Sequence, residues 1–134
     1  RLAVPREGYR AWFGGLSLSR HAQGPVLDAA YAYLNWWLSG WPGAVMARQG
    51  YYIGNPARTR DHLSSAEWDY WYAGKPAREE LLGSDGLPLI EIGEVRDGGA
   101  YEARMGHIAV WNSVMDEHNY LVRRWGDFMR ARVV

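Results

Sequence analysis

The chain has 134 residues, the size of one domain, which allows one hydrophobic core but not two. Its fifteen basic and fifteen acidic residues balance and form no block of like charge, which argues against a nucleic-acid-binding surface. Cysteine is absent, so disulfides, thiolate metal sites and thiol nucleophiles are excluded.

The first predicted element is a half-buried strand over residues 9–19. Residues alternate loosely there, so that one face carries Trp12, Gly14, Leu16 and Leu18. A lone strand of this kind presents an unpaired edge, which invites pairing with another chain.

Two helices are predicted next. Apolar residues recur at helical spacing over 25–39, with Pro25 at the entry and Gly40 just past the end. A shorter helix over 43–49 stops at Gly50, the residue type suited to a left-handed C-cap.

The middle of the chain predicts two further short helices. Ser64 and Glu67 have the spacing of a capping box, which indicates an aromatic helix over 68–72. Pro76 can begin another helix, which Gly83 ends.

The last third predicts turns, a short strand and two helices. Turn residues occupy 85–86 and 97–99, on either side of a short strand over 89–92. Two helical stripes follow; the first is Tyr101, Met105, Ile108, Asn112 and Met115, and the second is Leu121, Trp125 and Phe128. The sum is a helix-rich α+β unit that spans residues 1–134 as one piece.

Three groups of residues in the first sixty positions share an order with a known family. They are Glu7-Gly8 with Trp12, Asn35-Trp36 with Leu38, and Gly50-Tyr51 with Asn55. This order resembles the C-terminal part of the extracellular solute-binding proteins of ABC importers, especially the spermidine/putrescine-binding type. The resemblance implies the C-terminal portion of a type II periplasmic-binding-protein-like fold, a partial lobe that an N-terminal segment completes.

The resemblance also implies where a solute binds. By match, Trp12 packs its ring on the ligand in the interlobe cleft and Tyr51 offers its phenol, whereas a core tryptophan and a turn-capping phenol are the purely structural alternatives. Gly14 stands where amine binders carry an aspartate, so a ligand cation has to be held by aromatic faces or by acids elsewhere. Trp111 and Asn112 lie where the family makes a late polar contact, although plain helix packing explains them as well.

The implied function is binding rather than catalysis, with no cofactor and no metal. The four histidines lack the spacing that places two imidazoles on one helix face. The resemblance implies an exported protein, periplasmic or extracellular with its signal peptide removed, whose partners are a small solute and a membrane permease. As an isolated chain it is expected to self-associate, as a homodimer for example, because a separated lobe exposes apolar surface.

The alternative from another class is a self-contained aromatic-rich interaction or carbohydrate-binding module. In that hypothesis Trp68, Trp71 and Tyr72 form an exposed stacking platform. The degree of burial of these rings discriminates between the two hypotheses.

Overall fold

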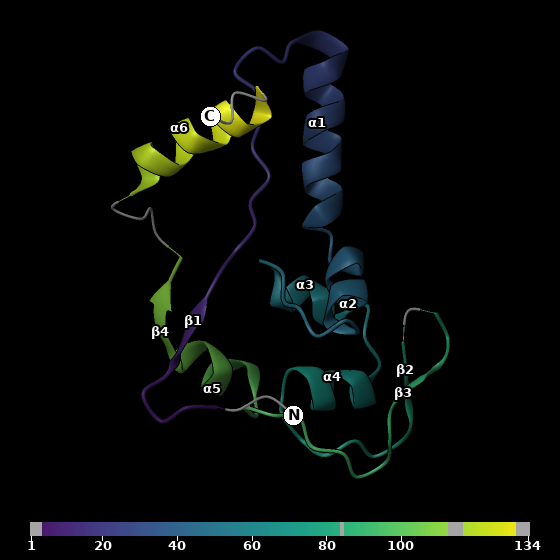
Figure 1. The fold of residues 1–134 in the computed structure, drawn as a ribbon. Coiled ribbons are helices and arrows are strands. Elements are labelled where there is room, and N and C mark those ends of the chain that lie inside the picture. Colours follow the sequence, from purple (N-terminus) through teal and green to yellow (C-terminus); the bar gives the residue numbers. More distant parts are fainter. Residues whose placement is uncertain (1–3, 84, 113–116, 131–134) are drawn as a thin grey trace.

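A computed structural model describes residues 4–83, 85–112 and 117–130 (Figure 1). In chain order the described elements are β1 (Tyr9–Ala11), α1 (Gly24–Trp37), α2 (Trp41–Ala47), α3 (Pro56–Arg60), α4 (Ser65–Trp71), β2 (Leu81–Leu82), β3 (Pro88–Ile90), α5 (Tyr101–Gly106), β4 (Ile108–Trp111) and α6 (His118–Met129). The protein is a small α+β structure in which helices predominate. No helix in the described ranges has the length and apolar character that crossing a membrane requires.

The local signals for α1, α2 and α4 are confirmed. Pro25 lies in the first turn of α1, where its missing N–H is not needed. Gly50 ends the α2 region with φ of 87°, a left-handed conformation that glycine adopts without steric cost. Ser64 and Glu67 form the capping box of α4, in which the Ser64 hydroxyl accepts from the Glu67 amide at 3.1 Å and the Glu67 carboxylate accepts from the Ser64 amide at 2.7 Å.

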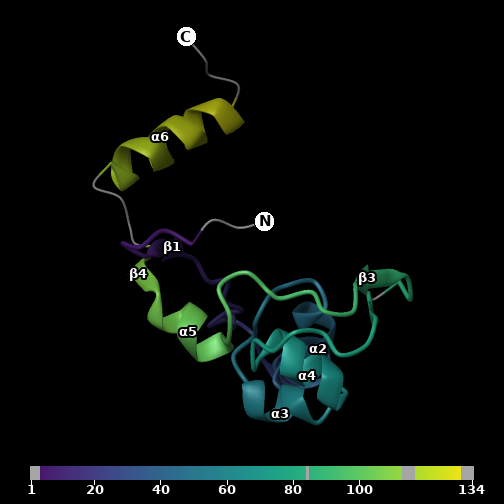
Figure 2. The same cartoon turned by 90° about the horizontal axis from the view of Figure 1, so that it is seen from below.

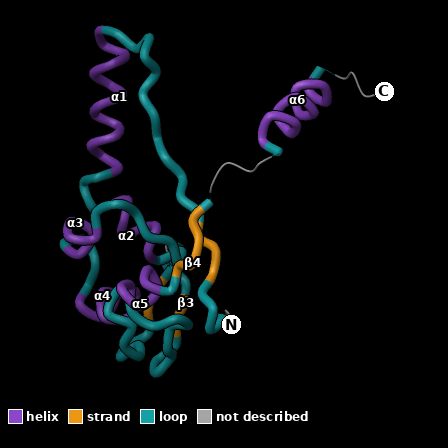
Figure 3. Tube along the Cα trace, turned by 90° about the vertical axis from the view of Figure 1, so that its left-hand side faces the viewer, coloured by secondary structure: helices purple, strands orange, loops and turns teal. Residues whose placement is uncertain are grey.

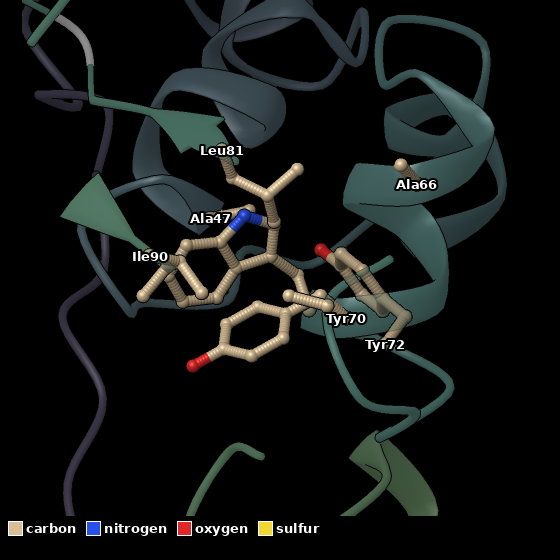
Figure 4. Packing of buried hydrophobic residues seen from close by; sticks show 8 residues of the cluster. Ala47, Ala66, Tyr70, Tyr72, Leu81 and Ile90 are labelled. Carbon is tan, nitrogen blue, oxygen red and sulfur yellow. The ribbon is translucent and has the colours of Figure 1, made fainter. Parts of the chain in front are cut away.

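The core forms where α4 packs against α2 and the β2–β3 hairpin. Its buried members are Ala47, Ala66, Tyr70, Trp71, Tyr72, Ala77, Leu81 and Ile90. Figure 4 shows Leu81 and Ile90 from the hairpin facing the aromatic rings of α4. The aromatic residues of this helix therefore fill the core, and Ala47 and Ala66 let the helices approach them closely.

The segment 76–83 forms no helix, so the predicted helix there is wrong: residues 78–79 bend, and 81–82 form the short strand β2. Leu81 pairs with Ile90 in an antiparallel ladder. Farther from the hairpin turn, the Ala77 amide donates to the Glu94 carbonyl at 2.9 Å and the Gly93 amide donates to the Ala77 carbonyl at 2.7 Å. These bonds between the two segments satisfy the backbone groups that a helix would have satisfied internally, and they bring Leu81 into the core.

The predicted helical stripe over 101–115 is only partly correct. Helix α5 ends at Gly106, and residues 108–111 form β4, which runs parallel to β1. The Tyr9 amide donates to the His107 carbonyl and the Asn112 amide donates to the Ala11 carbonyl, at 3.2 and 2.9 Å. Ile, Val and Trp favour strands, and the distant partner β1 decides the outcome. Met115 lies outside the described residues.

The predicted strand over 9–19 is shorter than expected. Only Tyr9–Ala11 joins the ladder with β4, and residues 12–19 lie outside regular secondary structure. Figures 1 and 3 show this stretch rising from β1 towards the far end of α1. Figure 2 shows α6 set apart from the body that contains α2–α5. No residue of α1 or α6, both of which the structure describes throughout, is buried.

Candidate functional site

Trp12 and Tyr51 lie together although their elements are far apart in the sequence. Their ring centroids are 6.4 Å apart and their planes meet at 67°, an edge-to-face contact. Trp12 remains 63% exposed and Tyr51 49% exposed. Trp12 is therefore not a core tryptophan, and the pair presents an open aromatic surface to solvent.

Local structure explains how each ring reaches this place. Trp12 directly follows β1, whose pairing with β4 fixes the direction of the chain. Tyr51 follows the turn at Gly50, where the Gly50 amide donates to the Ala47 carbonyl at 2.8 Å and the Tyr51 amide donates to the Met46 carbonyl at 3.0 Å. These bonds are the C-terminal cap of α2, so Tyr51 emerges from a rigid helix end.

Gly14 lies two residues beyond Trp12 in the same exposed stretch. A Cβ atom built on Gly14 meets no atom within 4 Å, so the position has open space around it. An aspartate, which the resembling amine binders carry here, therefore fits this backbone sterically. The absence of a carboxylate at Gly14 is a chemical difference rather than a consequence of crowding.

Trp111 is the last residue of β4 and Asn112 directly follows it, so neither belongs to a helix. The Trp111 ring contacts Phe13 edge to face, with 6.0 Å between centroids, and it is 47% exposed. Asn112 uses its side-chain oxygen to accept from the Arg10 Nε at 2.6 Å. The structure thus joins these two residues to neighbours in and after β1, but the ring contact of Trp111 is with Phe13 and not with Trp12 or Tyr51.

The predicted stacking platform at Trp68, Trp71 and Tyr72 is wrong. Trp71 and Tyr72 are only 5% and 3% exposed, and burial raises the pKa of Tyr72 to about 12. Trp68 is half-buried and stacks on Tyr72 with 4.4 Å between centroids and an interplanar angle of 5°. These rings stabilise the core, so they cannot serve as an open surface for a sugar.

The sequence did not identify Arg96, a buried arginine that bonds to Gly50 and Tyr52, the two neighbours of Tyr51. Arg96 is 8% exposed and lies in the segment between β3 and α5. Its guanidinium carbon lies 4.9 Å from the ring centroids of both Tyr52 and Trp71. Arginine is seldom buried, and nothing in the local sequence distinguishes Arg96 from the other arginines. Only the turn signal at 97–99 lies close to it.

An open cavity of about 960 Å³ lies beside Arg96. Gly50, Tyr70, Glu94 and Arg104 are among its lining residues. Burial is the main reason that the pKa of Tyr70 is raised to about 12, and the nearby Glu94 carboxylate, which accepts from the Tyr70 hydroxyl at 3.3 Å, adds to the effect. The lining contains both signs of charge and does not include Trp12 or Tyr51. Among the described residues, no three His, Asp or Glu side chains gather closely enough to hold a metal ion.

Comparisons of the chain with protein-family models, with curated proteins and with solved structures find no match.

Proposed function

We propose that this chain is the C-terminal part of the solute-binding component of an ABC importer. In this proposal Trp12 and Tyr51 form one aromatic wall of the solute cleft. The observation that carries the proposal is the contact between Trp12 and Tyr51, whose rings meet at 6.4 Å while both stay about half exposed or more. The same two positions are the ligand contacts that the family resemblance implies.

The chemistry of this wall favours a cationic or flat organic solute. An aromatic face attracts a cation placed over it, by up to about 2 kcal/mol when water is excluded. Gly14 brings no carboxylate to the wall, so an amine would need its counter-charge from residues outside it. Polyamines, their derivatives and other organic cations are therefore the first candidates.

In this proposal the rest of the solute cage belongs to a second lobe, within a type II periplasmic-binding-protein-like fold. The two lobes close on the solute by a hinge motion and deliver it to a membrane permease. The protein then acts outside the cytoplasmic membrane, in the periplasm or at the cell surface, and binds without catalysing a reaction.

The experiment is a calorimetric titration of the full-length protein with spermidine and with putrescine. We expect Trp12→Ala to weaken binding about tenfold or more, since loss of a desolvated cation–ring contact removes up to about 2 kcal/mol. Trp125→Ala is the matched control, because Trp125 is also 63% exposed but lies on α6. Equal affinities for the wild type and Trp12→Ala, or no binding of either amine by the wild type, would contradict the proposal.

A further inference from the structure

We infer that Arg96 is a positioning residue for Tyr51. It keeps the Tyr51 ring against Trp12 through hydrogen bonds to the two residues that flank Tyr51. Its Nη2 donates to the Gly50 carbonyl at 2.9 Å, and its Nη1 donates to the Tyr52 hydroxyl at 2.6 Å. These two acceptors belong to the residues on either side of Tyr51. One side chain, 44 residues beyond Tyr52, therefore bonds to both neighbours of the candidate ligand contact.

The guanidinium is fixed on its other sides as well. Its Nη1 also donates to the Trp71 carbonyl at 2.7 Å, which ties the segment to the end of α4. Tyr52 donates its own hydroxyl to the same carbonyl at 3.1 Å. The rings of Tyr52 and Trp71 each lie 4.9 Å from the guanidinium carbon, so the charge has two aromatic neighbours as well as its hydrogen bonds.

Burial makes this arrangement demanding. Desolvation lowers the pKa of Arg96 and raises that of Tyr52, because both charged forms are disfavoured away from water. Arginine nevertheless stays protonated in proteins, so its donors must be met by acceptors. Gly50, Tyr52 and Trp71 provide them, and removing the guanidinium would leave these acceptors without that donor.

Arginine is required here because of its shape. A planar guanidinium presents several donors in a fixed fan, whereas a lysine ammonium is a point charge on a flexible stem. A lysine at position 96 cannot reach the carbonyl of Gly50 and the groups of Tyr52 and Trp71 with the same geometry. Without these bonds, the segment around Tyr51 keeps the backbone bonds of the α2 cap and the bond from the Tyr52 hydroxyl to the Trp71 carbonyl, but loses the side chain that joins Gly50 to Tyr52.

The functional role of the Arg96 bonds rests on the proposed function, since they orient the Tyr51 ring, which we propose contacts the solute. The ring contact itself can be measured without any solute. Nuclear Overhauser cross peaks between the Trp12 indole and the Tyr51 ring report it, and single Trp12→Leu and Tyr51→Leu variants identify them. The Phe13–Trp111 pair, 6.0 Å apart at the same end of β1, is an internal reference that Arg96 does not contact in the structure.

In the 134-residue chain, we expect Arg96→Lys to lose the Trp12–Tyr51 cross peaks and keep those of Phe13–Trp111. Arg104→Lys is the matched control: Arg104 also lies over the Tyr52 ring, at 5.9 Å, but its Nη1 donates to the Asp97 carbonyl and not to residues 50–52. The Arg104→Lys variant should keep the cross peaks of both ring pairs. Intact Trp12–Tyr51 cross peaks in a folded Arg96→Lys would overturn the inference.

A second variant covers the case in which Arg96→Lys does not fold. Tyr52→Phe removes one of the acceptors beside Tyr51 and leaves the guanidinium bound to Gly50 and Trp71. We expect weakened Trp12–Tyr51 cross peaks with Phe13–Trp111 unchanged, and unchanged peaks for both pairs would overturn the inference. If the wild type binds neither spermidine nor putrescine, the proposed function fails, and the cross peaks still decide the role of Arg96.

Discussion

The Trp12 ring meets the Tyr51 ring edge to face at 6.4 Å, across the whole of α1 and α2 in the sequence. Edge-to-face pairs contribute about 0.5–1.5 kcal/mol beyond area burial, and these two rings bury little area because Trp12 stays 63% and Tyr51 49% exposed. The contact is therefore better suited to orienting two rings than to stabilising the fold. Both rings keep surface free for a third partner.

A carboxylate restored at position 14 should increase the affinity for amines. Gly14→Asp places the family's aspartate two residues beyond Trp12, in space where a Cβ meets no atom within 4 Å. We expect the affinity for putrescine to rise about tenfold, since a hydrogen bond to a charged group contributes about 1.5 kcal/mol. Calorimetric titration of the full-length protein measures it.

Gly15→Asp is the control for this variant. A Cβ at Gly15 also meets no atom within 4 Å, and the substitution adds the same charge one residue away. The two variants therefore differ only in which residue of the stretch after β1 carries the carboxylate. An equal rise for Gly15→Asp, or no rise for Gly14→Asp, would show that position 14 does not face the amine.

The α4 capping box should make the fold sensitive to acid. Burial alone would raise the pKa of Glu67, but hydrogen bonds from Arg48 and Ser64 outweigh it and hold the pKa below its ordinary value of 4.5. A carboxyl whose pKa is depressed by folding contributes stability above its unfolded pKa and loses it as the pH falls through the folded value. The wild type should therefore lose stability from about pH 4.5 downward.

Glu67→Gln removes this titration, so its free energy of unfolding in urea should change less over the same pH range. The variant should also be less stable than the wild type at neutral pH, because the 2.6 Å ion pair with Arg48 is lost. Glu80→Gln, at an exposed glutamate, should keep the acid dependence of the wild type. Parallel pH curves for Glu67→Gln and the wild type would refute the assignment.

Gly43 should not tolerate a methyl group, although alanine is the better helix former. A Cβ on Gly43 meets the Thr59 hydroxyl at closer than van der Waals distance and the Ile53 side chain at 3.0 Å. Thr59 is fully buried and donates its hydroxyl to the Asn55 carbonyl at 3.0 Å, so it cannot move away freely. Overpacking of about 1–3 kcal/mol should exceed a propensity gain of about 1 kcal/mol.

Urea unfolding of Gly43→Ala tests whether the cost of overpacking exceeds the gain in helix propensity. Gly54→Ala is the control, since a Cβ there meets nothing within 4 Å. A Gly43→Ala protein as stable as the wild type would mean that α2 and α3 can separate slightly without cost.

The isolated chain should self-associate. It exposes 10245 Å² of surface, whereas a compact monomer of 15.3 kDa exposes about 7,100 Å². Exposed apolar residues gather on α6 and in the stretch after β1, among them Trp12, Phe13, Leu16, Leu121, Trp125 and Phe128. Apolar surface of this kind usually marks an interaction site.

Sedimentation at micromolar concentration checks this expectation. A double Trp125→Ser, Phe128→Ser variant should shift the equilibrium towards monomer if α6 forms the contact. A wild-type chain that stays monomeric would favour an independent module over a separated lobe.

Local chemistry in the sequence was sufficient for α1, for the cap at Gly50 and for the Ser64–Glu67 capping box. Each of these depends on residues within one or two turns of one another, so propensity, periodicity and capping patterns contain the necessary information. The family resemblance also singled out Trp12 and Tyr51, although the sequence could not place their rings in contact.

Tertiary structure decided the remaining features. Residues 81–82 and 108–111 became strands, and Ala77 bonds to Gly93 and Glu94 instead of joining a helix, because their hydrogen-bond partners lie elsewhere in the chain, at 88–94 and 9–11. Trp71 is buried because α4 packs against the hairpin, and Arg96 reaches Gly50 and Tyr52 only after the chain has folded back on itself. The β1–β4 pairing and the bonds of Arg96 to Gly50 and Tyr52 join residues at least 44 positions apart, so no window of the sequence that contains only one partner can specify them.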